Sequence, residues 1–296
     1  MSFQRIFSKM LLPRLRGFSF LLMLLDGKKL SAKILDSVKR KVAAKKLKIG
    51  LAVILVGEHP ASVSYVRQKR RAAEKVGFAF REVNLPSSVS EQKLIATIDE
   101  LNLDHEIQGF IVQLPLPKKI STEKILERIS PTKDVDGFHP LNLGRGFLKL
   151  PTLLPATPAG ILRLLDESEI PLKGQNVVVV GHSNIVGKPL AMLLLNRDAT
   201  VSVCHVFTKN LAEFTRNADI IISATGVPHL IRAEMLKKNC VVVDAGCAQL
   251  DGKLVGDVDF ENVEKIVRAI TPVPGGVGPM TVATLIENTL RAAENF

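Results

Sequence analysis

Apolar residues in this chain fall into short runs that alternate with amphipathic segments, a pattern typical of strands and helices in turn. The first run, LAVILV at residues 51–56, ends at Gly57 and indicates a strand buried on both faces. A helical pattern over residues 61–76 ends at Gly77, a residue at which helices often end. Further along, the pattern predicts a helix at 91–101 and strands at 79–83 and 109–113.

A second block of this kind follows residues 130–158, a stretch rich in proline and glycine that indicates a domain junction. Strand-like runs then recur at 176–180, 199–204, 219–223, 240–244 and 267–270. Two successive blocks predict an α/β protein with two domains, each built on a parallel sheet. In such sheets ligands bind at the carboxyl ends of the strands, and the candidate residues below fall at those ends or on the helix just after them.

The beginning of the chain departs from this pattern. An apolar run at residues 18–25 follows basic residues, as in a signal or transit segment. It is too short to span a membrane, and no small-residue cleavage site follows it. We therefore predict that residues 1–22 form a non-structural extension of a cytoplasmic protein, with organellar targeting by this extension left open. Three cysteines without paired spacing also favour a reducing compartment.

The formal net charge is +11 at pH 7. No nucleic-acid-binding motif accompanies this charge, so we predict a basic surface that helps solubility or attracts an anionic small substrate, and no nucleic-acid partner. No metal site is predicted either, because Cys204 and His205 are adjacent but no second cluster of ligands follows them.

A candidate nucleotide site begins where the strand at 176–180 runs into GHSNIVGKP (181–189). A glycine turn between a buried strand and a helix lets backbone N–H groups hold a diphosphate, although Ser183 replaces the second glycine of the usual motif. Two later strands end in Thr225-Gly226 and Asp244-Ala245-Gly246, small residues at adjacent strand ends. No acid occurs at 199–212 to bind the ribose of NAD, which favours NADP; candidate cationic neighbours are His182, Lys188 and Lys209.

A candidate chemical site begins with Tyr65 and Lys69, which lie four residues apart on one face of the predicted helix. A lysine can act as a general acid or base when burial lowers its pKa, whereas an isolated pair of this kind is more often an ordinary surface lysine beside a tyrosine. Gln113, the first residue of QLPLP, stands at the end of a predicted strand. Asp136 lies in a tight acidic turn, and its carboxylate could pair with the edge of a pterin ring. The stiff loop PVPGGVGPMT (272–281) precedes the last helix, and its bare backbone can approach a flat ligand.

Together these segments resemble the bifunctional methylenetetrahydrofolate dehydrogenase/cyclohydrolase family. The shared strings occur in the family's order and cover essentially everything from residue 25 onward. They are SYVRQK (64–69), QLPLP (113–117), KDVDGFHP (133–140), GHSNIVGKP (181–189), SATG (223–226), GDVDF (256–260) and TPVPGGVGPMT (271–281).

The resemblance implies two α/β domains, the second a Rossmann-like dinucleotide-binding domain, with a substrate cleft between them. Residues 23–157 with 280–296 would form the folate-binding catalytic domain, and residues 158–279 the NAD(P)-binding domain. It implies that Lys69 is the principal acid/base residue, tuned by Gln113, and that Tyr65 and Asp136 orient and anchor the pterin. The other implied substrate contacts are Gly276, Gly278 and Pro279, and the cofactor contacts are Gly181, His182, Ser183, Thr225, Gly226 and Cys247.

The implied activity is oxidation of 5,10-methylenetetrahydrofolate with NADP, followed by hydrolysis to 10-formyltetrahydrofolate. The expected partners are tetrahydrofolate derivatives, with or without a polyglutamate tail, and a second copy of the chain in a homodimer. The sequence departs from the family at His182, where Arg is usual, and at Val206, where a polar or basic residue is usual, which leaves NAD open as the cofactor. Cys247 and Ala156 also depart from the usual residues, at positions that need supply neither charge nor protons.

Other functions remain open at the level of sequence. A dehydrogenase with a weak or lost cyclohydrolase step would carry the same strings. A dehydrogenase for a small acid, of shikimate or amino-acid type, would not need the QLPLP and PGGVGP loops. A nucleotide-binding regulatory protein would bind the cofactor without turnover, and the joint presence of Tyr65, Lys69, Gln113 and Asp136 speaks against it.

Overall fold

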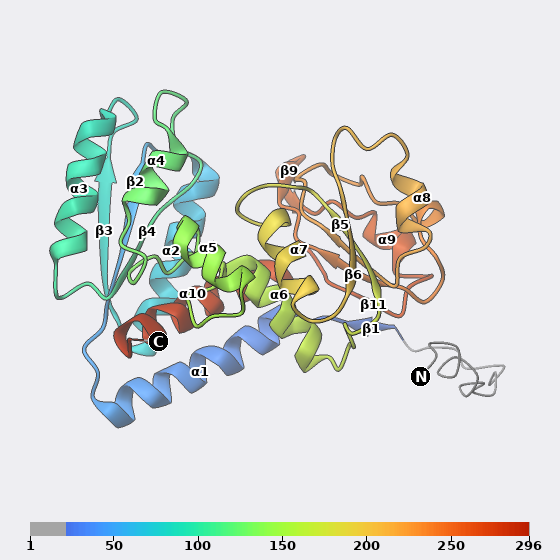
Figure 1. Cartoon of the computed structure of the whole chain (residues 1–296), viewed down its shortest axis with the longest axis horizontal. Coiled ribbons are helices and arrows are strands. Elements are labelled where there is room, and N and C mark those ends of the chain that lie inside the picture. Colours follow the sequence, from blue (N-terminus) through green and yellow to red (C-terminus); the bar gives the residue numbers. More distant parts are fainter. Residues whose placement is uncertain (1–21, 296) are drawn as a thin grey trace, which may run out of the picture.

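The computed structural model describes residues 22–295, so the predicted extension at residues 1–22 lies almost wholly outside the described part. Two parallel sheets form two separate lobes, as Figure 1 shows. Helices α1 (Gly27–Lys45) and α10 (Val277–Ala293) run beside each other, starting at the core of the second sheet and continuing under the first lobe. The predicted α/β fold with two domains is therefore confirmed.

The first sheet has the order β3-β2-β4, with β2 (Gly50–Val56) between β3 (Ala79–Leu85) and β4 (Gly109–Val112). Every residue of β2 is buried, as its continuous apolar run predicts. Alternate β2 side chains enter two separate cores because successive strand residues point to opposite faces. One core packs against α1, α10 and α2 (Pro60–Val76), and the other against α3 (Glu91–Leu103) and α4 (Thr122–Arg128).

The second sheet is also parallel, with the order β1-β11-β8-β7-β5-β6. Its strands are β1 (Met23–Leu24), β5 (Asn176–Val180), β6 (Thr200–Cys204), β7 (Ile220–Ser223), β8 (Val241–Asp244) and β11 (Ala269–Ile270). One face packs against α6 (Ala156–Glu167) and α7 (Gly187–Leu195). The other face lies against α8 (Leu211–Thr215), the short 3₁₀ helix Ala233–Met235 and α9 (Phe260–Val263).

The register of the second sheet brings four strand ends together. Val180 pairs with both Cys204 and Ser223, and Ser223 pairs with Asp244. The last residues of β5, β6, β7 and β8 therefore lie at one edge, where a doubly wound sheet binds its ligand.

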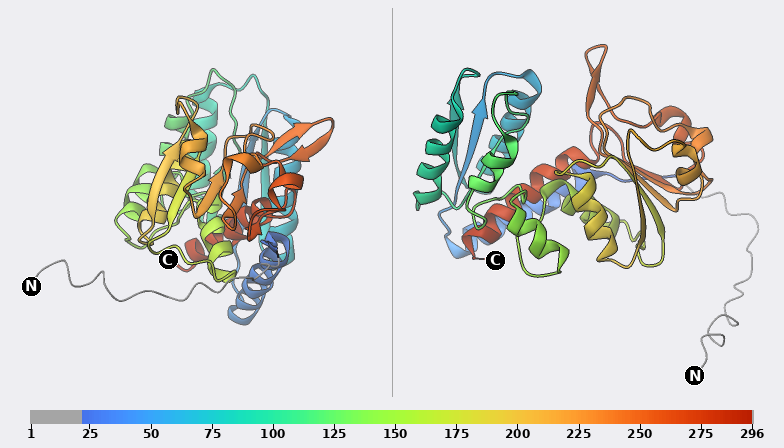
Figure 2. Two further views of the ribbon diagram at one scale, coloured as in Figure 1. Left: turned by 90° about the vertical axis from the view of Figure 1, so that its right-hand side faces the viewer. Right: turned by 45° about the horizontal axis from the view of Figure 1, so that its top comes forward.

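Three features differ from the sequence patterns. The stretch 130–158 contains helix α5 (Pro140–Phe147) and the start of α6, because Pro140, Pro155 and Pro158 stand in or just before the first turns of these helices, where the missing N–H costs nothing. Met23–Leu24, placed with the first domain by sequence, pairs with β11 of the second sheet. An antiparallel hairpin, β9 (Ala248–Leu250) with β10 (Lys253–Val255), was not predicted and projects from the second lobe, as Figure 2 shows.

Within residues 22–295 no helix combines the length and the apolar character needed to cross a bilayer.

Helix α10 is fastened to the first lobe by Asn288, which is 2% exposed. Its side-chain amide donates to the carbonyls of Val135 and Leu154, each at 2.9 Å. Val135 lies in the acidic turn, and Leu154 lies just before α6. The Asn288 side chain therefore links α10 to both segments.

We expect Asn288→Ala to lower the free energy of unfolding by about 1–3 kcal/mol, because it leaves two buried carbonyls without their donor. The matched control is Asn217→Ala, which removes an amide that donates to Glu213 from an exposed position and should change stability by less than about 0.5 kcal/mol. Urea denaturation of both variants measures the difference. Equal stability of the two variants would contradict the proposed fastening.

Candidate active site

Lys69 lies on α2 and is 3% exposed, which is rare for a lysine. Its ammonium donates to Gln113 Oε1 at 3.0 Å, and Gln113 stands directly after β4. The Gln113 amide nitrogen in turn donates to the Leu114 carbonyl at 2.8 Å, which fixes the amide with its oxygen toward the lysine. The helix and the strand end thus converge on one buried nitrogen.

Tyr65 lies one helical turn before Lys69. The Lys69 Nζ atom is 5.2 Å from the centre of the Tyr65 ring, within the range of a cation–π contact. The Tyr65 hydroxyl is hydrogen-bonded to Thr281 of α10, and Thr281 Oγ1 lies 2.9 Å from Thr157 Oγ1 of α6. Residues from α2, α6 and α10 therefore meet around the phenol.

Asp136 stands in the acidic turn, close to Lys69 and Tyr65. The negative charge of its carboxylate raises the pKa of both groups. The preceding acid, Asp134, is buried and accepts hydrogen bonds from Gly137 N, His139 N and Asn142 Nδ2, so it holds the turn itself. Gly137 has φ +77°, and a Cβ there would meet the Leu154 carbonyl carbon at 2.5 Å. Within residues 22–295 no group donates a hydrogen bond to the Asp136 side chain, which leaves this carboxylate for a ligand.

Burial dominates the electrostatics of this group. It lowers the pKa of Lys69, an effect that the Asp136 carboxylate only partly opposes. It raises the pKa of Asp136, again against the attraction of Lys69. Burial also raises the pKa of Tyr65 to about 12, so the phenol stays protonated at any working pH. Lys69 is therefore better suited than an ordinary lysine to exchanging protons near neutral pH.

The glycine turn after β5 has the geometry of a phosphate cradle. Gly181 has φ +117°, and a Cβ there would lie 2.5 Å from the Ala224 carbonyl oxygen. A Cβ at Gly187 would lie 2.1 Å from the Gly181 carbonyl oxygen, so neither position accepts a larger residue. The Ser183 hydroxyl accepts from Val186 N at 3.2 Å and shapes this turn. The backbone entering α7 is thereby left bare for a diphosphate.

Two imidazoles stand beside this turn. The rings of His182 and His205 have centroids 4.7 Å apart, and Phe207 packs edge-on against His205 at 5.9 Å. His205 directly follows β6, so it occupies the position where doubly wound folds recognise the adenosine ribose. Val206 beside it is 83% exposed. The sequence analysis did not single out His205 for this role; its place directly after the predicted second strand of the unit was the available signal.

At the ends of the next two strands, Thr225 and Gly226 follow β7 and Cys247 follows β8. Cys247 is exposed, whereas Cys204 and Cys240 are buried. Cys247 lies near Tyr65, because its thiolate, when formed, would raise the phenol pKa. The loop after β8 in the second lobe therefore approaches the Lys69 group of the first.

The loop before α10 completes the surroundings. Gly276 donates to the Pro272 carbonyl at 2.8 Å and is the last residue before the helix. Gly278 and Pro279 lie in the first turn of α10, and a Cβ at Gly278 would meet no atom within 4 Å. This turn is two residues from Thr281, the contact of Tyr65 that the sequence analysis did not identify. The signal that could have found Thr281 is its position as the last residue of the glycine-rich string at 272–281.

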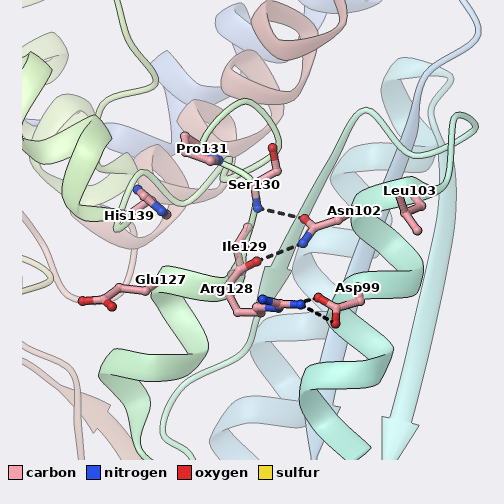
Figure 3. Close-up of a pocket in the computed structure, with 9 residues that line it drawn as sticks. All are labelled: Asp99, Asn102, Leu103, Glu127, Arg128, Ile129, Ser130, Pro131 and His139. Atoms are coloured by element: carbon pink, nitrogen blue, oxygen red, sulfur yellow. Dashed lines mark hydrogen bonds and ion pairs between the residues drawn. The ribbon is translucent and has the colours of Figure 1, made fainter.

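A separate hollow of about 470 Å³ lies between α3, α4 and the loop that follows α4. Figure 3 shows that several of its polar groups bond to one another: Arg128 pairs with Asp99, and Asn102 bonds to Arg128 and Ser130. Glu127 and His139 are further polar residues that line the hollow. Within residues 22–295 there is also no group of three or more histidine, cysteine or acidic side chains placed to hold a metal ion.

Comparison with known proteins gives two family matches. Residues 25–136 match the catalytic domain of tetrahydrofolate dehydrogenase/cyclohydrolase, and residues 155–296 match its NAD(P)-binding domain. The protein named bifunctional protein FolD from Nautilia profundicola is 54% identical over 277 residues, covering 92% of this chain and 98% of its own.

Two solved structures extend the likeness. The bifunctional FolD dehydrogenase/cyclohydrolase from Campylobacter jejuni is 50% identical with a TM-score of 0.91, covering 93% of this chain and 99% of its own. The dehydrogenase-cyclohydrolase from Trypanosoma brucei, complexed with NADP cofactor and an inhibitor, is 36% identical with a TM-score of 0.89, covering 93% of this chain and 98% of its own.

The Lys69–Gln113 contact leads to a testable prediction. Gln113→Leu removes the acceptor that favours the charged ammonium and should lower the pKa of Lys69 further, whereas Gln113→Glu should raise it. NMR titration of lysine side chains labelled with ¹³C measures both shifts. The surface variant Gln92→Leu is the control for a change of amide elsewhere. A Lys69 pKa that is the same in all variants would refute the coupling.

Proposed function

Because this chain belongs to the tetrahydrofolate dehydrogenase/cyclohydrolase family, we propose that the group around Lys69 serves both reactions in that name. The protein is an enzyme that oxidises 5,10-methylenetetrahydrofolate with a nicotinamide dinucleotide and hydrolyses the methenyl product to 10-formyltetrahydrofolate. The observation that carries the assignment of residues is the buried hydrogen bond from Lys69 to Gln113 beside Asp136.

The bare turn from Gly181 to Gly187 fits a dinucleotide diphosphate, since a Cβ at either glycine would collide with backbone. Ser183, Thr225, Gly226 and Cys247 lie at the same edge of the sheet and are the further contacts we propose. These residues would hold the dinucleotide, which would supply the hydride acceptor for the first reaction. For this step the residues of the chain chiefly orient the folate, because removing a hydride needs no protein nucleophile.

The pterin is held, in this proposal, by Asp136 and Tyr65. The free Asp136 carboxylate can accept two hydrogen bonds from the guanidine-like edge of the ring. The Tyr65 phenol stays neutral and offers a flat face, fixed through Thr281. Gly276, Gly278 and Pro279 leave room at the start of α10 for the rest of the ring system.

Lys69 moves the protons of the second reaction. Its lowered pKa provides neutral amine, which takes a proton from the water that attacks the methenyl carbon. The resulting ammonium is stabilised by the Gln113 oxygen and returns the proton to the ring nitrogen that leaves, while the remaining hydroxyl proton passes to solvent as the formyl C=O forms. Tyr65, with a pKa of about 12, orients this lysine and exchanges no proton itself.

NADP is the cofactor we propose, with NAD as a usable alternative. No carboxylate occurs on the loop after β6 to repel the extra phosphate, and His182 and His205 stand where that phosphate would lie. Imidazole lacks the fixed charge and the paired donors of a guanidinium, so the preference for NADP should be weaker than it would be with arginine at this position. Val206 contributes neither charge nor a hydrogen bond.

Four further properties belong to this proposal. A polyglutamate tail on the folate would be attracted by a chain with net charge +11. We also retain a homodimer, a cytoplasmic location, and domains at 23–157 with 280–296 and at 158–279. Within this division, β1 belongs to the first domain by sequence but pairs with β11 of the second domain.

We expect Lys69→Met to lower the cyclohydrolase rate by at least about 100-fold, because it removes the acid/base group. The dehydrogenase rate should fall by less than about tenfold, since hydride removal needs no proton transfer. Absorbance of the methenyl product, followed with NADP or NAD supplied separately, measures both steps. Lys75→Met is the control, an exposed lysine on the same helix that pairs with Asp36. Full cyclohydrolase activity in Lys69→Met would exclude this role.

We expect His182→Arg to raise the ratio of kcat/KM for NADP over NAD by roughly tenfold, because the guanidinium stays charged and binds phosphate through two hydrogen bonds. His105→Arg, an exposed histidine of the first lobe, is the control. An NADP/NAD ratio that is unchanged in His182→Arg would disprove the role of His182.

A further inference from the structure

The motif GDVDF (256–260) has no part in the chemistry above, yet it supplies the most deeply buried carboxylate at the cofactor edge of the second sheet. Asp257 is 0% exposed and lies behind the ends of β7 and β8. A carboxylate is costly to bury, so its contacts are the place to look for its function.

Asp257 binds the end of β7 through a single oxygen. Its Oδ2 accepts from the Ser223 hydroxyl at 2.7 Å and from the Thr225 backbone N–H at 2.7 Å. Its Oδ1 is buried and has no hydrogen-bond partner within residues 22–295. This oxygen would lie 2.0 Å from a Cβ at Gly246, so it is packed against the loop after β8.

Asp244, the last residue of β8, holds Asp257 in turn. Asp244 Oδ1 accepts from Gly246 N at 2.8 Å and from Asp257 N at 3.0 Å, and its Oδ2 accepts from Val258 N at 2.9 Å. A Cβ at Gly256 would lie 1.9 Å from Asp244 Oδ2, which accounts for the glycine that opens the motif. The two carboxylates thus connect the loops after β7 and β8 through their backbone N–H groups.

We propose that Asp257 is a positioning residue for the dinucleotide, which holds the Thr225–Gly226 loop in its binding shape through Thr225 N–H and the Ser223 hydroxyl. The inference rests on the proposed function, in which the dinucleotide lies at the ends of β5, β7 and β8. It goes further by assigning the acidic motif to dinucleotide affinity. The folate group around Lys69 does not depend on Asp257.

The test compares Asp257→Leu, which removes both hydrogen bonds, with Asp257→Asn, whose amide oxygen can still accept from Thr225. The matched control is Asp219→Leu. Asp219 directly precedes β7, at the end of that strand opposite Ser223, and its carboxylate accepts from Asn176 N at 2.9 Å. Each variant is measured for NADP affinity by calorimetry and for cyclohydrolase rate with added methenyltetrahydrofolate and no dinucleotide. Thermal melting reports the stability of each variant.

We expect Asp257→Leu to weaken NADP binding by roughly tenfold or more and to keep the cyclohydrolase rate, because two buried donors lose their acceptor only at the dinucleotide edge. Asp257→Asn should remain within about threefold of the unmodified enzyme, and Asp219→Leu should keep its affinity even if it melts earlier. If Asp257→Leu does not fold, Ser223→Ala replaces it, with weaker NADP binding and an unchanged cyclohydrolase rate expected.

Unchanged NADP affinity in the folded variant would overturn the proposal. Equal loss of affinity and cyclohydrolase rate, in proportion to lowered melting temperature, would also overturn it, because a merely structural role predicts that result. If the unmodified enzyme itself neither binds NADP nor converts 5,10-methylenetetrahydrofolate, the proposed function has failed rather than the role of Asp257.

Discussion

In the mechanism proposed here, the chemistry depends on keeping a lysine amine out of water without pairing it fully to a carboxylate. Lys69 is buried and donates to a neutral amide oxygen at 3.0 Å, while Asp136 is close enough to act on it only through its field. A direct ion pair would fix the ammonium in its charged form, and full isolation would leave it neutral throughout. The amide acceptor permits both protonation states, which a residue that first accepts and then returns a proton requires.

The rest of the fold can be understood as support for this arrangement. Helix α2 presents Tyr65 and Lys69 on one face, the end of β4 presents Gln113, and α10 returns from the second sheet to fix Tyr65 through Thr281. The same helix α10 is fastened by Asn288 to the carbonyls that flank the acidic turn. Because α1 and α10 pack against the second sheet with their first turns and against the first sheet with their later turns, the same two helices connect the second sheet to the elements around the lysine.

Much of this arrangement follows from local sequence. The buried runs predicted the central strands, and the spacing of Tyr65 and Lys69 predicted a shared helix face, because both depend on short-range periodicity. Features set by distant contacts were not accessible in the same way. The pairing of β1 with β11, the contact of Thr281 with Tyr65 and the stacking of His205 on His182 join residues far apart in the chain. Helix α5 was missed because proline and glycine predict a loop, although Pro140 in fact begins a helix.

The most direct test of the central claim is the pH dependence of the cyclohydrolase reaction, measured without dinucleotide and corrected for uncatalysed hydrolysis. If a buried amine accepts the proton, kcat/KM should rise with pH and level off at an apparent pKa below the ordinary lysine value of about 10.4, since burial lowers the pKa of Lys69. The pH at which kcat/KM reaches half of its plateau value should equal the pKa of Lys69 measured by NMR. A rate that increases in proportion to hydroxide across the whole range, without a plateau, would contradict the account.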